Sequence, residues 1–258
     1  MSSRPLLADW LTTLADRCRR PIAPEAVGRL QILSERVLEA AQHQNLTALR
    51  DRERLLMEGV GPSLALWPLL PERGPMVDIG SGAGIPGVVL ACLEPARPWL
   101  LIESRQRRAE FLAGVVAELG LRATVLAERA EQTGHGPHRQ QAVGVTARRI
   151  GALGVVAELG LPLLRVGGQL LSPCGEQTPV PDAHQLGLIG LLGGRLEWVA
   201  EPELPGFQRR GRVAVIEKRR PTPARYPRQP PALGSGVLVL KGEAPAGSEV
   251  RPLGRRGG

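Results

Sequence analysis

Three features are scarce in this chain of 258 residues: aromatic side chains, cysteines and long hydrophobic runs. The seven aromatic residues form no cluster, which disfavours a protein that binds single-stranded nucleic acid by stacking. Three cysteines without metal-ligand spacing exclude a disulfide scaffold and fit a reducing compartment. No run of about 18 uncharged apolar residues exists, and Asp9 and Asp16 interrupt the apolar N-terminal stretch. We therefore expect a cytoplasmic protein with no signal peptide and no membrane span.

Acidic residues are scarce at one end of the chain. Residues 208–258 hold 12 Lys and Arg against 3 Asp and Glu, whereas residues 1–207 hold 21 against 22. A basic segment on a neutral body is typical of proteins that bind a polyanion, most often nucleic acid. The alternative is coding bias, because 31 of the 33 basic residues are arginine and because glycine and proline are plentiful. Charge alone favours nucleic acid and does not exclude the alternative.

The hydrophobic pattern changes near residue 70. Up to that point apolar residues recur at helical spacing, with a polar connection over 44–51 in which Asn45 or Thr47 could cap a helix. Pro62 and Pro68 predict a break into two short helices. From residue 75, strands alternate with helices, as in a parallel sheet with right-handed crossovers. We expect strands at 75–79, 99–103, 123–127, 142–146 and 168–172, and helices at 86–93, 106–119, 151–164 and 184–192.

The end of the chain departs from this alternation. The strand candidates 195–200 and 212–218 have no convincing helix between them, which predicts an antiparallel pair at the end of a sheet of about seven strands. After Lys218 the sequence has no periodicity. We therefore divide the chain into an N-terminal helical segment (1–70), an α/β core (71–218) and a basic tail (219–258) that we expect to be extended and flexible.

The strongest local signal is the glycine-rich segment DIGSGAGIPG at 78–87, between a strand and a helix. Gly80 and Gly82 remove side chains where the backbone must turn and approach a ligand. The segment also contains a G-x-G-x-x-G match, so an NAD-binding oxidoreductase is one alternative. Asp78 places a carboxylate before the loop, and Pro86 removes an N–H that a diphosphate would use. A zwitterionic ligand such as S-adenosylmethionine fits these two residues better.

Acidic and basic residues follow the next strands. Glu103 ends the second strand, 21 residues after Gly82, where a carboxylate accepts hydrogen bonds from ribose hydroxyls. The alternative is a surface ion pair between Glu103 and a neighbouring arginine, Arg105 or Arg107. Ala130–Glu131 follows the third strand and Arg148 the fourth. Because open α/β sheets bind ligands at the carboxyl ends of their strands, these residues are candidates for the same site.

Taken together, these segments resemble the GidB/RsmG family of bacterial 16S ribosomal RNA guanine-N7 methyltransferases. The segment QNLTALRD is similar to the family's NLT-x-x-R-D, the glycine loop to its D-[IVL]-G-[ST]-G-x-G-x-P-G, and VIEKRRPTPARYPRQP to the end of many members. The resemblance implies a Rossmann-like S-adenosylmethionine-dependent methyltransferase fold and 16S ribosomal RNA or the small ribosomal subunit as partner. We expect a monomer. The candidate cofactor-binding residues are Asp78, Gly80, Gly82, Ile85, Glu103, Ala130, Glu131 and Arg148.

The chain departs from the family pattern at four of its positions. Gly59 and Pro62 stand where many members have His and Asp, Cys174 where they have Lys, and Arg149 where they have Ala. Guanine N7 carries no proton to remove, so its methylation needs no general base, and we assign no catalytic residue. A second alternative is a non-catalytic ribosome-binding protein that keeps the cofactor fold. Because His135 and His138 have no third ligand nearby in the sequence, we expect no metal site.

Overall fold

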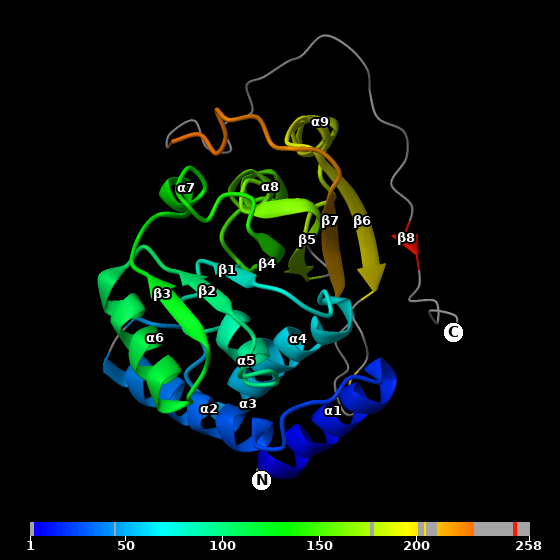
Figure 1. Cartoon of the computed structure of the whole chain (residues 1–258). Coiled ribbons are helices and arrows are strands. Elements are labelled where there is room, and N and C mark those ends of the chain that lie inside the picture. Colours follow the sequence, from blue (N-terminus) through cyan, green and yellow to red (C-terminus); the bar gives the residue numbers. More distant parts are fainter. Residues whose placement is uncertain are drawn as a thin grey trace.

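The computed structural model describes residues 3–43, 45–175, 178–200, 204, 211–229 and 250–251. A mixed β-sheet lies between two layers of helices (Figure 1). The helices of residues 3–69 share one face with α5 (Gly87–Ala91) and α6 (Gln106–Glu118). The other face packs against α7 (Ala130–Thr133), α8 (Leu153–Gly160) and α9 (Ala183–Leu191). The alternating strands and helices of the sequence predict this three-layer arrangement.

The strands of the described residues follow the order β3-β2-β1-β4-β5-β7-β6-β8. They are β1 (Met76–Ile79), β2 (Trp99–Ile102), β3 (Ala123–Leu126), β4 (Ala142–Ala147), β5 (Leu164–Cys174), β6 (Gly194–Ala200), β7 (Arg212–Lys218) and β8 (Val250–Arg251). β7 runs antiparallel to both β5 and β6, which confirms the predicted antiparallel pair. The sheet is therefore not parallel throughout, and this argues against the dinucleotide-binding alternative. The sequence does not predict β8 or the four-residue helix α7.

Helices make up the start of the described chain, as predicted. They are α1 (Ser3–Cys18), α2 (Ala26–His43), α3 (Arg52–Arg54), the π-helix η1 (Leu55–Val60), α4 (Gly61–Leu64) and the 3₁₀-helix η2 (Trp67–Leu69). The two predicted short helices are confirmed as α4 and η2, which carry Pro62 and Pro68 in their first turns, where a missing N–H is tolerated. The cap of α3 is Asp51, whose side chain accepts the Arg54 N–H at 2.8 Å, and not Asn45 or Thr47. Among the described residues no helix is long and apolar enough to cross a membrane.

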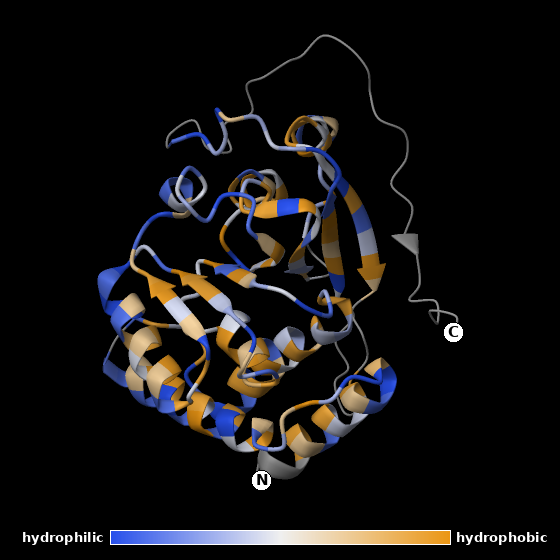
Figure 2. Ribbon diagram, in the orientation of Figure 1, coloured by the Kyte–Doolittle hydropathy of each residue, from blue (hydrophilic) through white to orange (hydrophobic). Residues whose placement is uncertain are grey.

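The hydrophobic core has one cluster on each face of the sheet. Met76 and Leu101 pack toward the N-terminal helices, whereas their strand neighbours Val77 and Ile102 pack toward α8 and α9. This alternation follows from the two-residue period of a strand. Figure 2 shows the hydrophobic residues gathered in the strands and in α5, α8 and α9. Burial on both faces explains why the strand sequences are almost continuously apolar.

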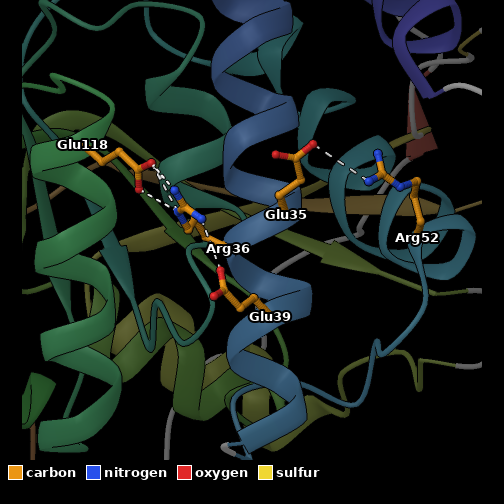
Figure 3. Close-up of polar contacts among 5 residues, drawn as sticks. All are labelled: Glu35, Arg36, Glu39, Arg52 and Glu118. Carbon is orange, nitrogen blue, oxygen red and sulfur yellow. Dashed lines mark hydrogen bonds and ion pairs between the residues drawn. The ribbon is translucent and has the colours of Figure 1, made fainter.

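Ion pairs join helix α2 to α6 and to its N-terminal neighbour α3 (Figure 3). Arg36 of α2 donates to both carboxylate oxygens of Glu118 in α6, at 2.7 and 2.9 Å, and to Glu39 at 3.2 Å. Hydrogen bonds to Arg36 lower the pKa of the Glu118 carboxyl. A second ion pair, between Arg52 and Glu35 at 3.9 Å, joins α3 to α2. These pairs are half-exposed, so they fix the docking of α2 more than they add stability.

Residues 219–229, named the strap below, correct the expectation of a flexible tail for that stretch. The strap crosses the face of the domain that carries α7, α8 and α9 (Figure 1, orange). It follows Lys218, the last residue of β7, whose ammonium group is buried and donates to the carbonyls of Leu161 and Leu164 at 2.8 and 2.6 Å. Tyr226 in the strap is 0% exposed. The rest of the tail, apart from β8, lies outside the described residues.

Candidate cofactor site

The glycine loop joins the end of β1 to the start of α5 at the centre of the sheet. The N–H groups of Gly80 and Ser81 both donate to the carbonyl of Ile102, at 2.8 and 3.1 Å, so the loop is fastened to the end of β2. Gly82 has a φ of +52°, which favours glycine. Apart from its two chain neighbours, the nearest atom to a Cβ there would be the Gly80 carbonyl oxygen, at 3.7 Å. The loop therefore leaves open space beside Gly82 that a ligand can enter.

The buried side chain of Asp78 bonds to the end of this loop. It is 0% exposed, and its carboxylate accepts the Thr146 hydroxyl at 2.6 Å and the Gly87 N–H at 3.1 Å. Burial raises the pKa of the Asp78 carboxyl to about 6, against the hydrogen bonds from Thr146, Ser81 and Gly87, which lower it. A Cβ at Gly87 would lie 2.6 Å from the Asp78 carboxylate. Asp78 thus bonds to Thr146 of β4 and to Gly87 at the end of the loop, and the sequence pattern does not predict these contacts.

Glu103 lies at the end of β2, beside the glycine loop. Its two carboxylate oxygens accept the backbone N–H of Gly82 at 3.0 Å and of Arg105 at 2.8 Å. Glu103 is 5% exposed, and among the described residues it forms no ion pair. The surface ion pair with the Arg105 or Arg107 side chain is therefore the wrong interpretation. The sequence indicated Glu103 and the glycine loop separately, and the structure places them in direct contact.

A shallow cavity of about 100 Å³ opens above the loop. Its walls are Leu46, Thr47, Leu49, Gly80, Ser81, Gly82, Ala83, Ile85, Arg148 and Arg149. The first three come from the connection between α2 and α3, for which the sequence suggested only a helix cap. The Arg108 side chain fixes this connection by donating to the Asn45 carbonyl at 2.6 Å. The N-terminal segment thus supplies one wall of the site, and its similarity to the family's NLT-x-x-R-D segment was the available signal.

Arg148 follows β4 and lines the cavity, but its guanidinium reaches across to the N-terminal segment. It donates to the backbone carbonyl of Glu58 and, at 3.5 Å, to that of Gly59. Both carbonyls belong to the π-helix η1, a helix type often found at functional sites. The structure therefore gives Arg148 a contact that sequence reasoning missed, between the sheet edge and the helical segment. Its neighbour Arg149 is exposed, with a φ of +56°, at the rim of the cavity.

Ala130 and Glu131 begin the short helix α7, after β3. Both are buried, at 7% and 5% exposure. They come from the same edge of the sheet as the glycine loop, because β1, β2 and β3 are parallel neighbours. Neither residue is among those that line the cavity. Their predicted contact with a cofactor stays a prediction.

The positions that differ from the family pattern are filled in a specific way. A Cβ at Gly59 would lie 3.2 to 3.3 Å from the side chains of Ile85, Leu49 and Leu55, so hydrophobic groups have closed around it. Cys174 ends β5 and is buried, and burial raises the pKa of its thiol.

His135, one of the two histidines considered as metal ligands, contacts the Pro227 carbonyl. The described residues contain no group of three His, Cys, Asp or Glu that could hold a metal ion.

The sheet order, the antiparallel β7, and the glycine loop beside an acidic residue at the end of β2 define a Rossmann-like S-adenosylmethionine-dependent methyltransferase. Comparison with known proteins agrees with this class. The chain belongs to the GidB family, rRNA small subunit methyltransferase G, whose model matches residues 27–179. This confirms the resemblance seen in the sequence.

Curated relatives support the same assignment over more of the chain. The chain is 40% identical to ribosomal RNA small subunit methyltransferase G of Roseiflexus castenholzii over 189 residues, which is 71% of this chain and 80% of that protein. It is 36% identical to the protein of the same name from Symbiobacterium thermophilum over 236 residues, which is 88% of this chain and 94% of the relative.

Proposed function

We propose that this chain transfers a methyl group from S-adenosylmethionine to N7 of a guanine in 16S ribosomal RNA. The observation that carries the proposal is the bond between the Gly82 N–H and the Glu103 carboxylate, at 3.0 Å. It brings the open side of the glycine loop next to a buried acceptor suited to ribose hydroxyls. The family relatives are named as methyltransferases of small-subunit ribosomal RNA, and we extend that substrate to this chain and place it in the cytoplasm.

The residues of the cavity fit a reaction that requires positioning alone. The described wall contains no histidine, lysine or carboxylate. Guanine N7 offers a lone pair and no proton, so the absence of a base from the wall does not prevent methylation. When bound, S-adenosylmethionine supplies the electrophilic methyl group. The loop and Glu103 hold the cofactor, Arg149 at the rim attracts the RNA phosphates, and the departures at Gly59, Pro62 and Cys174 remove no group that the chemistry needs.

A methylation assay with separate binding measurements tests the proposal. The purified chain is incubated with methyl-labelled cofactor and either 16S ribosomal RNA or small subunits, and the digested nucleosides are separated. We expect label in 7-methylguanosine. Tight binding of S-adenosylhomocysteine by calorimetry without transfer to either substrate would support the non-catalytic alternative. Binding of NAD in place of S-adenosylhomocysteine would support the oxidoreductase.

The Glu103→Ala variant tests the cofactor half of the site alone. Removing this buried acceptor should leave the ribose hydroxyls without a partner and weaken cofactor binding by about 1–3 kcal/mol. The matched control is Glu110→Ala, which removes an exposed carboxylate from α6 and should leave the affinity unchanged. Equal affinities for both variants would remove Glu103 from the site.

A further inference from the structure

The strap is held at its far end by a buried ion pair. The Glu158 side chain of α8 is 0% exposed, and the Arg228 side chain is 18% exposed. The Arg228 backbone N–H and Nε donate to one carboxylate oxygen, at 2.9 and 2.8 Å, and Nη2 donates to the other at 2.7 Å. Since a buried carboxylate is costly without partners, the place of Arg228 is strongly specified. The strap therefore ends at a defined point on the domain.

A second arginine joins the strap to the chain that leaves α7. Arg139 donates to the carbonyls of Thr222 and Pro223 at 2.9 and 3.2 Å, and to that of Tyr226 at 2.7 Å. The same guanidinium donates to the Gly134 carbonyl, at the end of α7, at 2.7 Å. The Arg139 side chain thus bonds both to the strap and to the end of α7.

The strap also touches α7 directly. A Cβ at Gly134 would lie 2.8 Å from two ring carbons of Pro227, so the two backbones pack closely. The His135 ring lies 2.7 Å from the Pro227 carbonyl oxygen, and Ala130 shares a core cluster with Tyr226. A helix of four residues has too few internal hydrogen bonds to hold its own position. Packing against its neighbours must therefore set where α7 lies.

We propose that the strap is the positioning element for α7 and, through it, for Ala130 and Glu131, the predicted cofactor contacts at the start of that helix. Arg228 and Arg139 act as positioning residues that do not touch the cofactor. This inference rests on the proposed function, since it assigns part of the tail to the cofactor site. The basic tail then has two roles, with residues 219–229 serving the pocket and residues 230–258 left for RNA.

The test compares Arg228 variants of the full chain. In Arg228→Ala, we expect the dissociation constant for S-adenosylhomocysteine and the KM for S-adenosylmethionine to rise about tenfold or more, because Ala130 and Glu131 are misplaced. The kcat at saturating cofactor and the KM for RNA should stay within about twofold. Arg228→Lys, which keeps one charged donor, should recover part of the affinity. Truncation after residue 229 should bind cofactor like the full chain.

Two controls separate positioning from general destabilisation. Leu14→Ala lowers stability through a buried residue of α1, on the opposite face of the sheet, and should not change cofactor affinity in the folded protein. Arg36→Ala breaks another Arg–Glu ion pair, a half-exposed one between α2 and α6, away from α7. Loss of stability in Arg228→Ala with unchanged cofactor affinity would overturn the inference. If the full chain itself bound no cofactor, the proposed function would be at fault instead.

Discussion

Arg148 donates a hydrogen bond to the backbone carbonyl of Glu58, the residue four positions before Pro62. Glu58 lies in the π-helix η1, and Pro62, which has no N–H to donate, lies in the first turn of the next helix, α4. The guanidinium from the end of β4 thus donates to the helical segment at the junction of η1 and α4. Pro62 departs from the family pattern and lies about one turn after the two carbonyls, of Glu58 and Gly59, that Arg148 contacts.

Arg148 and Pro62 should therefore be coupled in stability. We expect Arg148→Ala to lower the free energy of unfolding by about 1.5–3 kcal/mol, because it removes a charged hydrogen bond to a half-buried carbonyl. In a Pro62→Ala background, which adds a backbone N–H at the junction of η1 and α4, the decrease should be smaller by at least about 0.5 kcal/mol. Urea unfolding of the four proteins measures the difference. Arg149→Ala serves as the exposed control, and equal decreases in the two backgrounds would contradict the coupling.

Gly82→Val should eliminate cofactor binding, because a branched side chain would occupy the open space beside the loop. The positive φ of Gly82 adds strain of roughly 1–2 kcal/mol to this variant. Gly114→Val is the matched control, since Gly114 is exposed on α6 and a Cβ there meets nothing within 4 Å. Calorimetry measures the affinity of both variants for S-adenosylhomocysteine. Retained binding in Gly82→Val would place the ligand elsewhere.

The buried Asp78 should make stability depend on pH in the absence of ligand. Its pKa in the folded protein, about 6, lies above the ordinary value of 3.8, so folding favours the protonated carboxyl. This contribution is fully present below about pH 4 and disappears as the pH rises through about 6. It amounts to roughly 2–3 kcal/mol for a shift of this size. The Asp78→Asn variant, which keeps a neutral side chain, lacks it.

The measurement is the difference in unfolding free energy between the wild-type chain and Asp78→Asn from pH 4 to pH 7. The wild type should lose stability relative to the variant as the pH rises over this range. A difference that stays constant with pH would show that Asp78 titrates at its ordinary value.

Truncation after residue 229 should weaken RNA binding and leave the cofactor site intact. It removes Lys241, Arg251, Arg255 and Arg256 against Glu243 and Glu249. The slope of log affinity against log salt should flatten by about 0.7–0.9 for each phosphate that is no longer bound. Filter binding to 16S ribosomal RNA at several salt concentrations gives the slope. An unchanged slope would support coding bias as the origin of these charges.

The strands and the glycine loop could be predicted because their signals are local. Apolar runs of four to six residues separated by glycine and proline mark the strands, and Glu103 stands at a fixed place after one of them. The strap could not be predicted, since residues 219–229 carry no periodicity. Their order comes from contacts with Arg139 and Glu158, which lie 70 to 87 residues away in the sequence.

For the candidate site, the sequence likewise predicted which residues take part but not the groups that they contact. The sequence indicated that Asp78 and Arg148 belong to the site. It did not show that both bond to protein groups, because the partner of Arg148 is a backbone carbonyl 90 residues away and that of Asp78 is Thr146 on a neighbouring strand. Side-chain types predict which edge of the sheet is functional, and the fold decides what each side chain reaches.

The most direct test of the central claim is mass spectrometry of nucleosides from 16S ribosomal RNA of cells with and without this gene. We expect the 7-methylguanosine content to fall when the gene is deleted, to return with the wild-type gene, and to stay low with Gly82→Val. An unchanged 7-methylguanosine content after deletion would contradict the account and favour a ribosome-binding protein without methyltransferase activity.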